Sequence, residues 1–238
     1  MGKIIILPET TRNPITLIGE RAGLCWGSDT SDPKKNLKRG LKCIESGHGR
    51  TLEFPNVEMV IDGYSARVMR EWYTHIGCLP ARLQQSTRYI DYSDFDYIVP
   101  QSVINAPTKD EPAFIGRGPE RIYHDAMNYL KVAISELVYC GVPREDAALI
   151  LPFGMTTRIT DKRNLRNLID MSHQRMCTRA YWEYREMFKD ISDALSGISE
   201  EWEWIVRTQF KPKCELFGYC PEEHGCGKYL KKGKNGDA

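Results

Sequence analysis

The longest periodic stretch of the chain, residues 119–140, predicts a single helix with one apolar face. Its apolar residues recur at helical spacing, at Ile122, Ala126, Tyr129, Leu130, Ala133 and Leu137. A helix of this kind is stable in water mainly when its apolar face packs against another layer. The chain has 238 residues, which is enough to bury a large core. We therefore expect a layered globular fold in which this helix is a core element.

Shorter patterns fill the rest of the chain. Branched and apolar residues predict strands at 3–7, 15–18, 56–61 and 155–160. Apolar residues at helical spacing predict helices at 33–46, 65–75, 144–151, 164–175, 180–195 and 200–208. Proline and glycine predict a loop at 101–118. Because no repeat or clear linker separates these elements, the predicted fold class is α+β, a single domain with helices packed on an antiparallel or mixed sheet.

This domain is expected to span residues 1–210. Residues 211–238 then form a Cys- and His-containing extension, whose Lys- and Gly-rich end at 227–238 is expected to be disordered.

Composition limits the partners that the chain can recruit. Hydrophobic residues make up 41% and charged residues 27%, as in soluble globular proteins. The net charge is +1, so no overall field attracts nucleic acid or an acidic membrane, and any anion site must be local. No apolar run approaches the ~20 residues of a membrane span, and the N-terminus lacks the features of a secretory signal. We expect a cytoplasmic protein.

Residues 84–92, Gln-Gln-Ser-Thr-Arg-Tyr-Ile-Asp-Tyr, form the densest polar motif. They follow a predicted helix and a glycine- and proline-containing break. Ser86 offers a hydroxyl group and Arg88 a planar fork of donors, a combination that favours a phosphate or carboxylate site. The alternative is a solvated turn. His48, between Gly47 and Gly49, either lets backbone approach a flat ligand or belongs to an ordinary loop.

The eight cysteines fall into two groups. Five are scattered and are expected to be reduced thiols: Cys25, Cys43, Cys78, Cys140 and Cys177. The others form a C-terminal cluster with one histidine: Cys214, Cys220, His224 and Cys226. Three thiols and one imidazole are the right donors for a structural zinc site. Since the cluster lacks a Cys-x-x-Cys pair, free thiols in a surface tail remain the alternative.

Six short motifs occur in order between residues 38 and 190. They are Gly47-His48; Arg70-Glu71-Trp72-Tyr73; Gln84-Gln85-Ser86-Thr87-Arg88-Tyr89; Gly141-Val142-Pro143-Arg144-Glu145 with Leu151-Pro152; Thr157-Arg158 with Asn164-Leu165-Arg166; and Arg175 with Trp182-Glu183. In order and spacing this set resembles the flavin-dependent thymidylate synthases.

The resemblance implies the α+β fold and the chemistry of that family. The reaction is the reductive methylation of dUMP to dTMP. Methylenetetrahydrofolate donates the methylene group, and NADPH supplies reducing equivalents through FAD. The family acts as a homo-oligomer, expected to be a tetramer, with sites between subunits. It uses no cysteine nucleophile, so none is assigned here.

The resemblance also implies residue roles. Arg175 is the expected catalytic cation beside the pyrimidine ring. The expected substrate-binding residues are Glu71, Trp72, Gln84, Gln85, Ser86, Thr87, Arg88 and Arg175. The expected cofactor-binding residues are His48, Thr51, Thr74, His75, Ile76, Arg82, Gln84, Asn164, Arg166 and Asp170. Without the resemblance, Trp72 and Trp182 are predicted to be core residues.

The chain departs from the family at several of these positions. Thr74 and Ile76 flank His75 where the family has Arg-His-Arg, and Arg82 is a candidate replacement for a lost guanidinium. Gln84 and Glu71 exchange an amide and a carboxylate relative to the family. These departures motivate two alternatives. One is flavin- and folate-dependent C5-methylation or hydroxymethylation of another pyrimidine deoxynucleotide. The other is a non-catalytic nucleotide-binding homologue.

Overall fold

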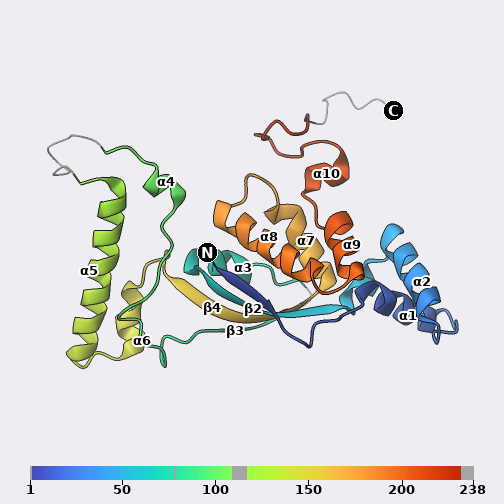
Figure 1. The fold of residues 1–238 in the computed structure, drawn as a ribbon, viewed down its shortest axis with the longest axis horizontal. Coiled ribbons are helices and arrows are strands. Elements are labelled where there is room, and N and C mark those ends of the chain that lie inside the picture. The colour runs from blue at the N-terminus through green and yellow to red at the C-terminus, as the bar shows by residue number, and fades with distance from the viewer. Residues whose placement is uncertain (1, 78, 109–116, 232–238) are drawn as a thin grey trace. The chain divides into compact units, whose positions relative to one another are not determined.

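The computed structural model describes residues 2–77, 79–108 and 117–231. It has the predicted α+β class, with a four-stranded antiparallel sheet in the order β1-β2-β4-β3 (Figure 1). The strands are β1 (Lys3–Ile6), β2 (Asn56–Ser65), β3 (Ala81–Gln84) and β4 (Thr156–Asn164). The predicted strands at 3–7, 56–61 and 155–160 are confirmed. Strand β3 was not predicted, because three of its four residues are exposed and it carries no alternating pattern.

The predicted strand at 15–18 is wrong, because this segment lies in helix α1 (Pro14–Cys25). Pro14 occupies the first turn, where its missing N–H costs nothing. Ile15, Ile18 and Ala22 are buried at helical spacing. The next helix, α2 (Pro33–Glu45), packs against α1, and the two lie side by side in Figure 1.

The chain divides into two compact units. The first unit consists of residues 1–2, Asp62–Tyr73 and Leu83–Ile159. The second unit consists of Lys3–Ile61, Thr74–Arg82 and the chain from Thr160 onward. Strands β2, β3 and β4 contribute residues to both.

The second unit contains most of the helices. Besides α1 and α2 it holds the short 3-10 helix η1 (Gly49–Glu53), α7 (Leu165–Arg175), α8 (Trp182–Ser196), α9 (Glu200–Gln209) and α10 (Lys213–Phe217). Helix α8 packs against α9 and β1 (Figure 1). A fully buried ion pair joins Arg163 to Asp161, and Arg163 also donates to Asn167 on α7 at 2.6 Å. The ion pair lies within β4, and the bond from Arg163 to Asn167 links the end of β4 to α7.

The first unit contains α3 (Ala66–Tyr73), α4 (Gln101–Ile104), α5 (Pro119–Tyr139), α6 (Arg144–Ala147) and the 3-10 helix η3 (Ala148–Ile150). Its core cluster consists of Tyr92, Phe95, Met127, Ile134, Ala147 and Met155. The predicted 144–151 helix is therefore two short helices. The 101–118 loop holds α4, and its residues 109–116 lie outside the described part of the chain.

Helix α5 is confirmed, but its predicted core role is only partly right. Met127 and Ile134 are buried, whereas Tyr129 is 73% exposed and Val132 is 55% exposed. Within a single chain, much of its apolar surface is therefore uncovered.

The extension after α9 is ordered further than predicted. The backbone of Cys220 pairs with that of Lys231 in an isolated parallel bridge, so residues 227–231 are placed. Residues 232–238 lie outside the described part. Among the helices described, none has both the length and the apolar character needed to span a membrane.

Candidate functional site

The Ser-Thr-Arg motif forms a loop in the first unit. Gln85 N donates to Arg158 O at 2.9 Å, which continues the pairing of β3 with β4. Ser86 Oγ then accepts from Arg88 N at 3.2 Å, which closes a tight turn. The Arg88 Nε donates to Glu145 Oε2 at 2.8 Å. Two motifs that are 57 residues apart in sequence are thus brought together, as a shared site requires.

The charges around this loop suit an anion. Arg88 and Glu145 are 66% and 51% exposed, and such a pair contributes about 0–1 kcal/mol. An anionic oxygen can therefore replace the Glu145 carboxylate at little cost. The pKa of Asp91 is lowered, first by hydrogen bonds from Ser93 and also by the charge of Arg144. Arg144 thus lies within electrostatic range of the same loop.

The other predicted substrate-binding residues in the first unit differ in how far they are exposed. Gln84 is exposed, and its Nε2 donates to Thr157 Oγ1 at 3.4 Å. Glu71 and Thr87 are half-buried. Trp72 is fully buried, so its core role is confirmed and its predicted contact with substrate is not supported. Trp182, in the second unit, is half-buried.

In the second unit, η1 and the start of α7 bring several predicted cofactor residues together. Arg166 Nη1 donates to Glu53 Oε1 at 2.6 Å. A Cβ added at Gly49 would lie 3.5 Å from Arg166 Cζ, so the arginine passes beside this glycine. Thr51 Oγ1 donates to His48 O at 2.7 Å, and the His48 side chain is exposed. Backbone, imidazole, hydroxyl and guanidinium groups therefore share one region.

Asn164 has a structural role in the same region. It is the N-cap of α7, and its side chain accepts from Asn167 N at 3.0 Å. That bond satisfies one of the free N–H groups at the helix start. The predicted cofactor contact of Asn164 would use its Nδ2 group, since its Oδ1 accepts the capping bond.

The far end of α7 carries Arg175, the predicted catalytic residue. Arg175 Nε donates to His75 Nε2 at 2.9 Å. Its guanidinium carbon lies 4.6 Å from the centroid of the Tyr184 ring, in a cation–π contact. The rings of His75 and Tyr184 meet edge to face, with centroids 6.2 Å apart. Two aromatic side chains thus hold this arginine.

The surroundings keep His75 neutral. Burial, followed by the charges of Arg175 and Arg163, lowers the pKa of His75 from 6.5 to about 4. At neutral pH the ring is therefore neutral, and the tautomer with its proton on Nδ1 lets Nε2 accept the hydrogen bond from Arg175. Tyr184 was not predicted as a site residue, since no sequence signal links it to Arg175.

The remaining predicted cofactor residues differ in exposure and position. Thr74 and Ile76 are exposed, and Arg82 is half-buried. Asp170 is exposed on α7. Burial lowers the pKa of His173, and the negative charge of Asp170 raises that pKa by a smaller amount. A Cβ added at Gly77 would lie 3.0 Å from Asn167 Nδ2, so the loop after His75 runs close over α7. Gln84 belongs to the first unit instead.

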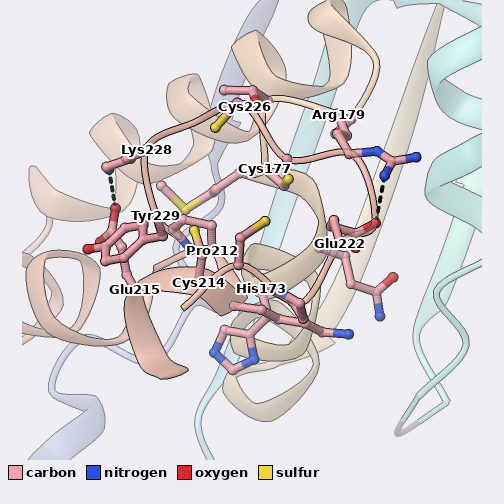
Figure 2. A pocket seen from close by; sticks show the side chains of 18 of the residues that line it. His173, Cys177, Arg179, Pro212, Cys214, Glu215, Glu222, Cys226, Lys228 and Tyr229 are labelled. Atoms are coloured by element: carbon pink, nitrogen blue, oxygen red, sulfur yellow. Dashed lines mark hydrogen bonds and ion pairs between the residues drawn. The ribbon is translucent and has the colours of Figure 1, made fainter. Parts of the chain in front are cut away.

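The C-terminal cysteines line a pocket of about 690 Å³ in the second unit (Figure 2). Cys177 from the α7–α8 connection lines it together with Cys214, Cys220 and Cys226, whereas His224 does not. Cys25, Cys43, Cys140 and Cys177 are free thiols, as expected, and Cys78 lies outside the described residues. Cys214, Cys220 and Cys226 are free thiols as well. In the described conformation no group of three or more His, Cys, Asp or Glu is arranged to hold a metal ion. The predicted set with His224 is thus not brought together.

Comparison with known proteins defines the class. The family model for the thymidylate synthase complementing protein matches residues 7–199, so the chain is an enzyme of this class. The flavin-dependent thymidylate synthase of Nitratidesulfovibrio vulgaris is 30% identical over 190 residues, covering 78% of this chain and 74% of that protein. The enzyme of Pyrococcus furiosus is 28% identical, and the match covers 96% of this chain and 95% of that protein. The enzyme of Geobacter sulfurreducens is also 28% identical, and the match covers 94% of each chain. The chain belongs to the family of flavin-dependent thymidylate synthases.

Proposed function

We propose that this chain catalyses the FAD-dependent reductive methylation of dUMP to dTMP, with methylenetetrahydrofolate as methylene donor and NADPH as reductant. The observation that carries this proposal is the fixed guanidinium of Arg175, which is held by His75 Nε2 and the Tyr184 ring. The names of the relatives support the same reaction.

The phosphate of the nucleotide is assigned to the loop of the first unit. Ser86 and Arg88 supply a hydroxyl group and a guanidinium, and the charge of Arg144 lies nearby. On binding, the phosphate takes the place of the Glu145 carboxylate at Arg88. Bidentate guanidinium contacts favour phosphate over neutral ligands.

The donor set of the second unit fits FAD. The cofactor needs close backbone approach for its flat ring, hydrogen-bonding groups for the ring edges and cations for its pyrophosphate. His48, Thr51 and His75 are hydrogen-bonding groups, and the Arg166 side chain is 43% exposed. Gly77 keeps the backbone close to α7, where an added Cβ would lie 3.0 Å from Asn167 Nδ2, and Gly49 lies beside Arg166. With Thr74 and Ile76 uncharged, Arg82 and Arg166 would provide the positive charge.

When bound, FAD supplies the redox chemistry that converts the transferred methylene group to a methyl group. The protein binds and orients the pyrimidine. Arg175 beside the ring favours its enolate-like form, since a cation stabilises developing negative charge. His75 stays neutral and keeps the guanidinium oriented. No cysteine acts as nucleophile.

We further propose that the active enzyme is a cytoplasmic homo-oligomer, as a tetramer. The uncovered apolar side chains of α5 support this proposal, since Ile122, Tyr129 and Val132 are exposed in the single chain. Exposed apolar surface of this kind is typical of an interface.

The test is an assay of purified protein with dUMP, methylenetetrahydrofolate and NADPH. A yellow protein that forms dTMP supports the proposal. A yellow protein that forms no dTMP but converts dCMP would favour the alternative substrate, which is motivated by the altered residues Glu71 and Gln84. A colourless protein that FAD cannot reconstitute, yet that binds dUMP, would favour a non-catalytic homologue.

A further inference from the structure

The pocket that the C-terminal cysteines line also contains Arg175, the proposed catalytic residue. Residues 173–180 line it together with residues of the extension after α9, from Pro212 to Tyr229 (Figure 2). This extension lies beyond residues 7–199, which match the family model. The pocket volume of about 690 Å³ falls within the roughly 300–1,000 Å³ of small-molecule sites. A ligand in this pocket therefore lies beside the cation that is assigned to the pyrimidine.

Positive charge exceeds negative charge around this pocket. Among the described residues, its charged lining consists of Arg175, Arg179, Lys213, Lys228, Glu215 and Glu222. His173 lines the pocket as well, and burial lowers the pKa of this histidine, so its ring is neutral at pH 7. The whole chain has a net charge of only +1. The excess of cations is therefore local, and it favours an anionic ligand.

The cations at the rim of the pocket are accessible to such a ligand. Arg179 Nη1 pairs with Glu222 Oε2 at 3.0 Å, and Lys228 Nζ pairs with Glu215 Oε1 at 2.6 Å. Figure 2 shows these two ion pairs on opposite sides of the pocket. All four side chains are more than a quarter exposed, and exposed pairs contribute little to stability. Lys213 is exposed and has no ion-pair partner among the described residues. Ligand carboxylates can therefore engage these cations at little cost.

An aromatic surface lies next to one of these cations. Lys228 Nζ is 5.9 Å from the centroid of the Tyr229 ring, and Tyr229 is half-buried in the pocket lining. Met176 and Pro212 add further apolar lining. A flat ring can pack against such a surface, and a carboxylate carried beside that ring then meets the ammonium group. The lining therefore suits a ligand that joins an aromatic ring to a carboxylate-bearing chain.

We propose that this pocket binds the aminobenzoyl-glutamate tail of the folate, with the ring against Tyr229 and the carboxylates at Lys213 and Lys228. The inference rests on the proposed methylation, in which the folate brings its methylene group to the reaction centre that contains Arg175. The dUMP phosphate is assigned to the loop of the first unit. NADPH is also anionic, but its charges are phosphates on sugars and not carboxylates beside a benzene ring. The extension thus acts as a binding element for the methylene donor.

The first experiment compares two methylene donors in the dTMP assay, methylenetetrahydrofolate and the same compound without its glutamate, methylenetetrahydropteroate. Lys213→Ala and Lys228→Ala should each raise KM for the folate roughly 3- to 10-fold, with a smaller change in kcat. Each should also reduce the preference for the folate over the pteroate. Lys228→Arg, which keeps the charge, should restore most of that preference.

The matched control is Lys189→Ala, which removes an exposed lysine that pairs with Asp193 on α8. It should leave KM for both donors unchanged. An equal rise in KM for folate and pteroate in the Lys213 and Lys228 variants, or a rise in KM for NADPH alone, overturns the assignment.

A direct binding measurement separates this proposal from the proposed reaction. Aminobenzoyl-glutamate itself should bind the full-length wild type in saturation-transfer NMR, and tetrahydrofolate should displace it. The double variant Lys213→Ala/Lys228→Ala should bind it about 10-fold more weakly. Binding by a protein that forms no dTMP would support the pocket assignment and count against the proposed function. Displacement by NADPH but not by tetrahydrofolate, or no binding to the wild type, overturns the pocket assignment even if dTMP is formed.

Discussion

Arg175 and His75 are joined by a single directed hydrogen bond, from Nε of the guanidinium to Nε2 of the imidazole at 2.9 Å. The donor of this bond is the Nε–H group of the guanidinium. The Tyr184 ring packs against the same guanidinium. In the proposed reaction this contact pair sets the orientation of the catalytic cation.

Removing the acceptor should therefore impair turnover more than binding. His75→Ala leaves Arg175 without its hydrogen bond to the imidazole, and a small misorientation of a catalytic group costs roughly 10- to 100-fold in rate. We expect kcat to fall by about that factor with a smaller change in KM for dUMP. His75→Gln, whose amide oxygen can accept the same bond, should recover part of the loss. Equal losses in His75→Gln and His75→Ala, with normal folding, would contradict this role.

The low pKa of His75 predicts a pH-dependent stability. The folded pKa is about 4 against an ordinary value of 6.5, so between these values the unfolded chain binds more protons. The stabilising contribution is complete above about pH 6.5 and is lost as the pH falls toward 4. Because the ring is only partly buried, we expect a loss of roughly 1–2 kcal/mol.

Urea unfolding at several pH values between 4 and 7 would measure this loss. Carboxylates also titrate near the lower end, so the matched comparison is His75→Gln, which has no titrating ring. The wild type should lose more stability than this variant over the same range. Parallel curves for the two proteins would show that His75 does not contribute.

The anion loop of the first unit predicts opposite effects for its two charged residues. Arg88→Ala removes a guanidinium that the phosphate needs, and losing a charge-assisted hydrogen bond of about 1.5–3 kcal/mol corresponds to roughly a 10- to 100-fold rise in Kd for dUMP. Glu145→Gln removes a competing carboxylate and should leave dUMP binding equal or tighter. Isothermal titration with dUMP measures both.

The control for this pair is Arg121→Ala. Arg121 is an exposed arginine on α5 that pairs with Asp125, and its removal tests whether any lost positive charge weakens binding. Weaker dUMP binding in Glu145→Gln, or unchanged dUMP binding in Arg88→Ala, would show that the phosphate does not bind at this loop.

Much of this arrangement could be predicted from the sequence where the information is local. Asp32 and Pro33 mark the start of α2, and the Asp32 side chain accepts from Lys34 N as an N-cap should. The motif order identified the family and placed Arg175 and Ser86 in candidate sites. The helix start depends on neighbouring residues, and the motifs are recognised from the order of residues in the chain. Neither requires knowledge of the tertiary structure.

The missed features depend on contacts between distant segments. Tyr184 meets Arg175 only because α8 packs against α7, and Cys177 joins the C-terminal cysteines only because the extension returns to the α7–α8 connection. The error at 15–18 has a different cause. A short apolar run fits a strand or a helix equally well, and here the buried positions Ile15, Ile18 and Ala22 show that packing against α2 selects the helix.

The packing of α1 on α2 leads to the last prediction. A Cβ added at Gly19 would lie 1.8 Å from the backbone oxygen of Asn36, and one at Gly40 would lie 2.0 Å from the backbone oxygen of Ile15. Backbone atoms of a helix cannot move aside as a flexible side chain can. Gly19→Ala should therefore force the two helices apart and destabilise the protein by about 3 kcal/mol.

Gly197→Ala is the matched control, because its Cβ would meet nothing closer than 3.6 Å. That variant should be neutral or up to about 1 kcal/mol more stable. Urea unfolding of both variants measures the difference, and a Gly19→Ala protein as stable as Gly197→Ala would show that the helix contact is looser than these distances require.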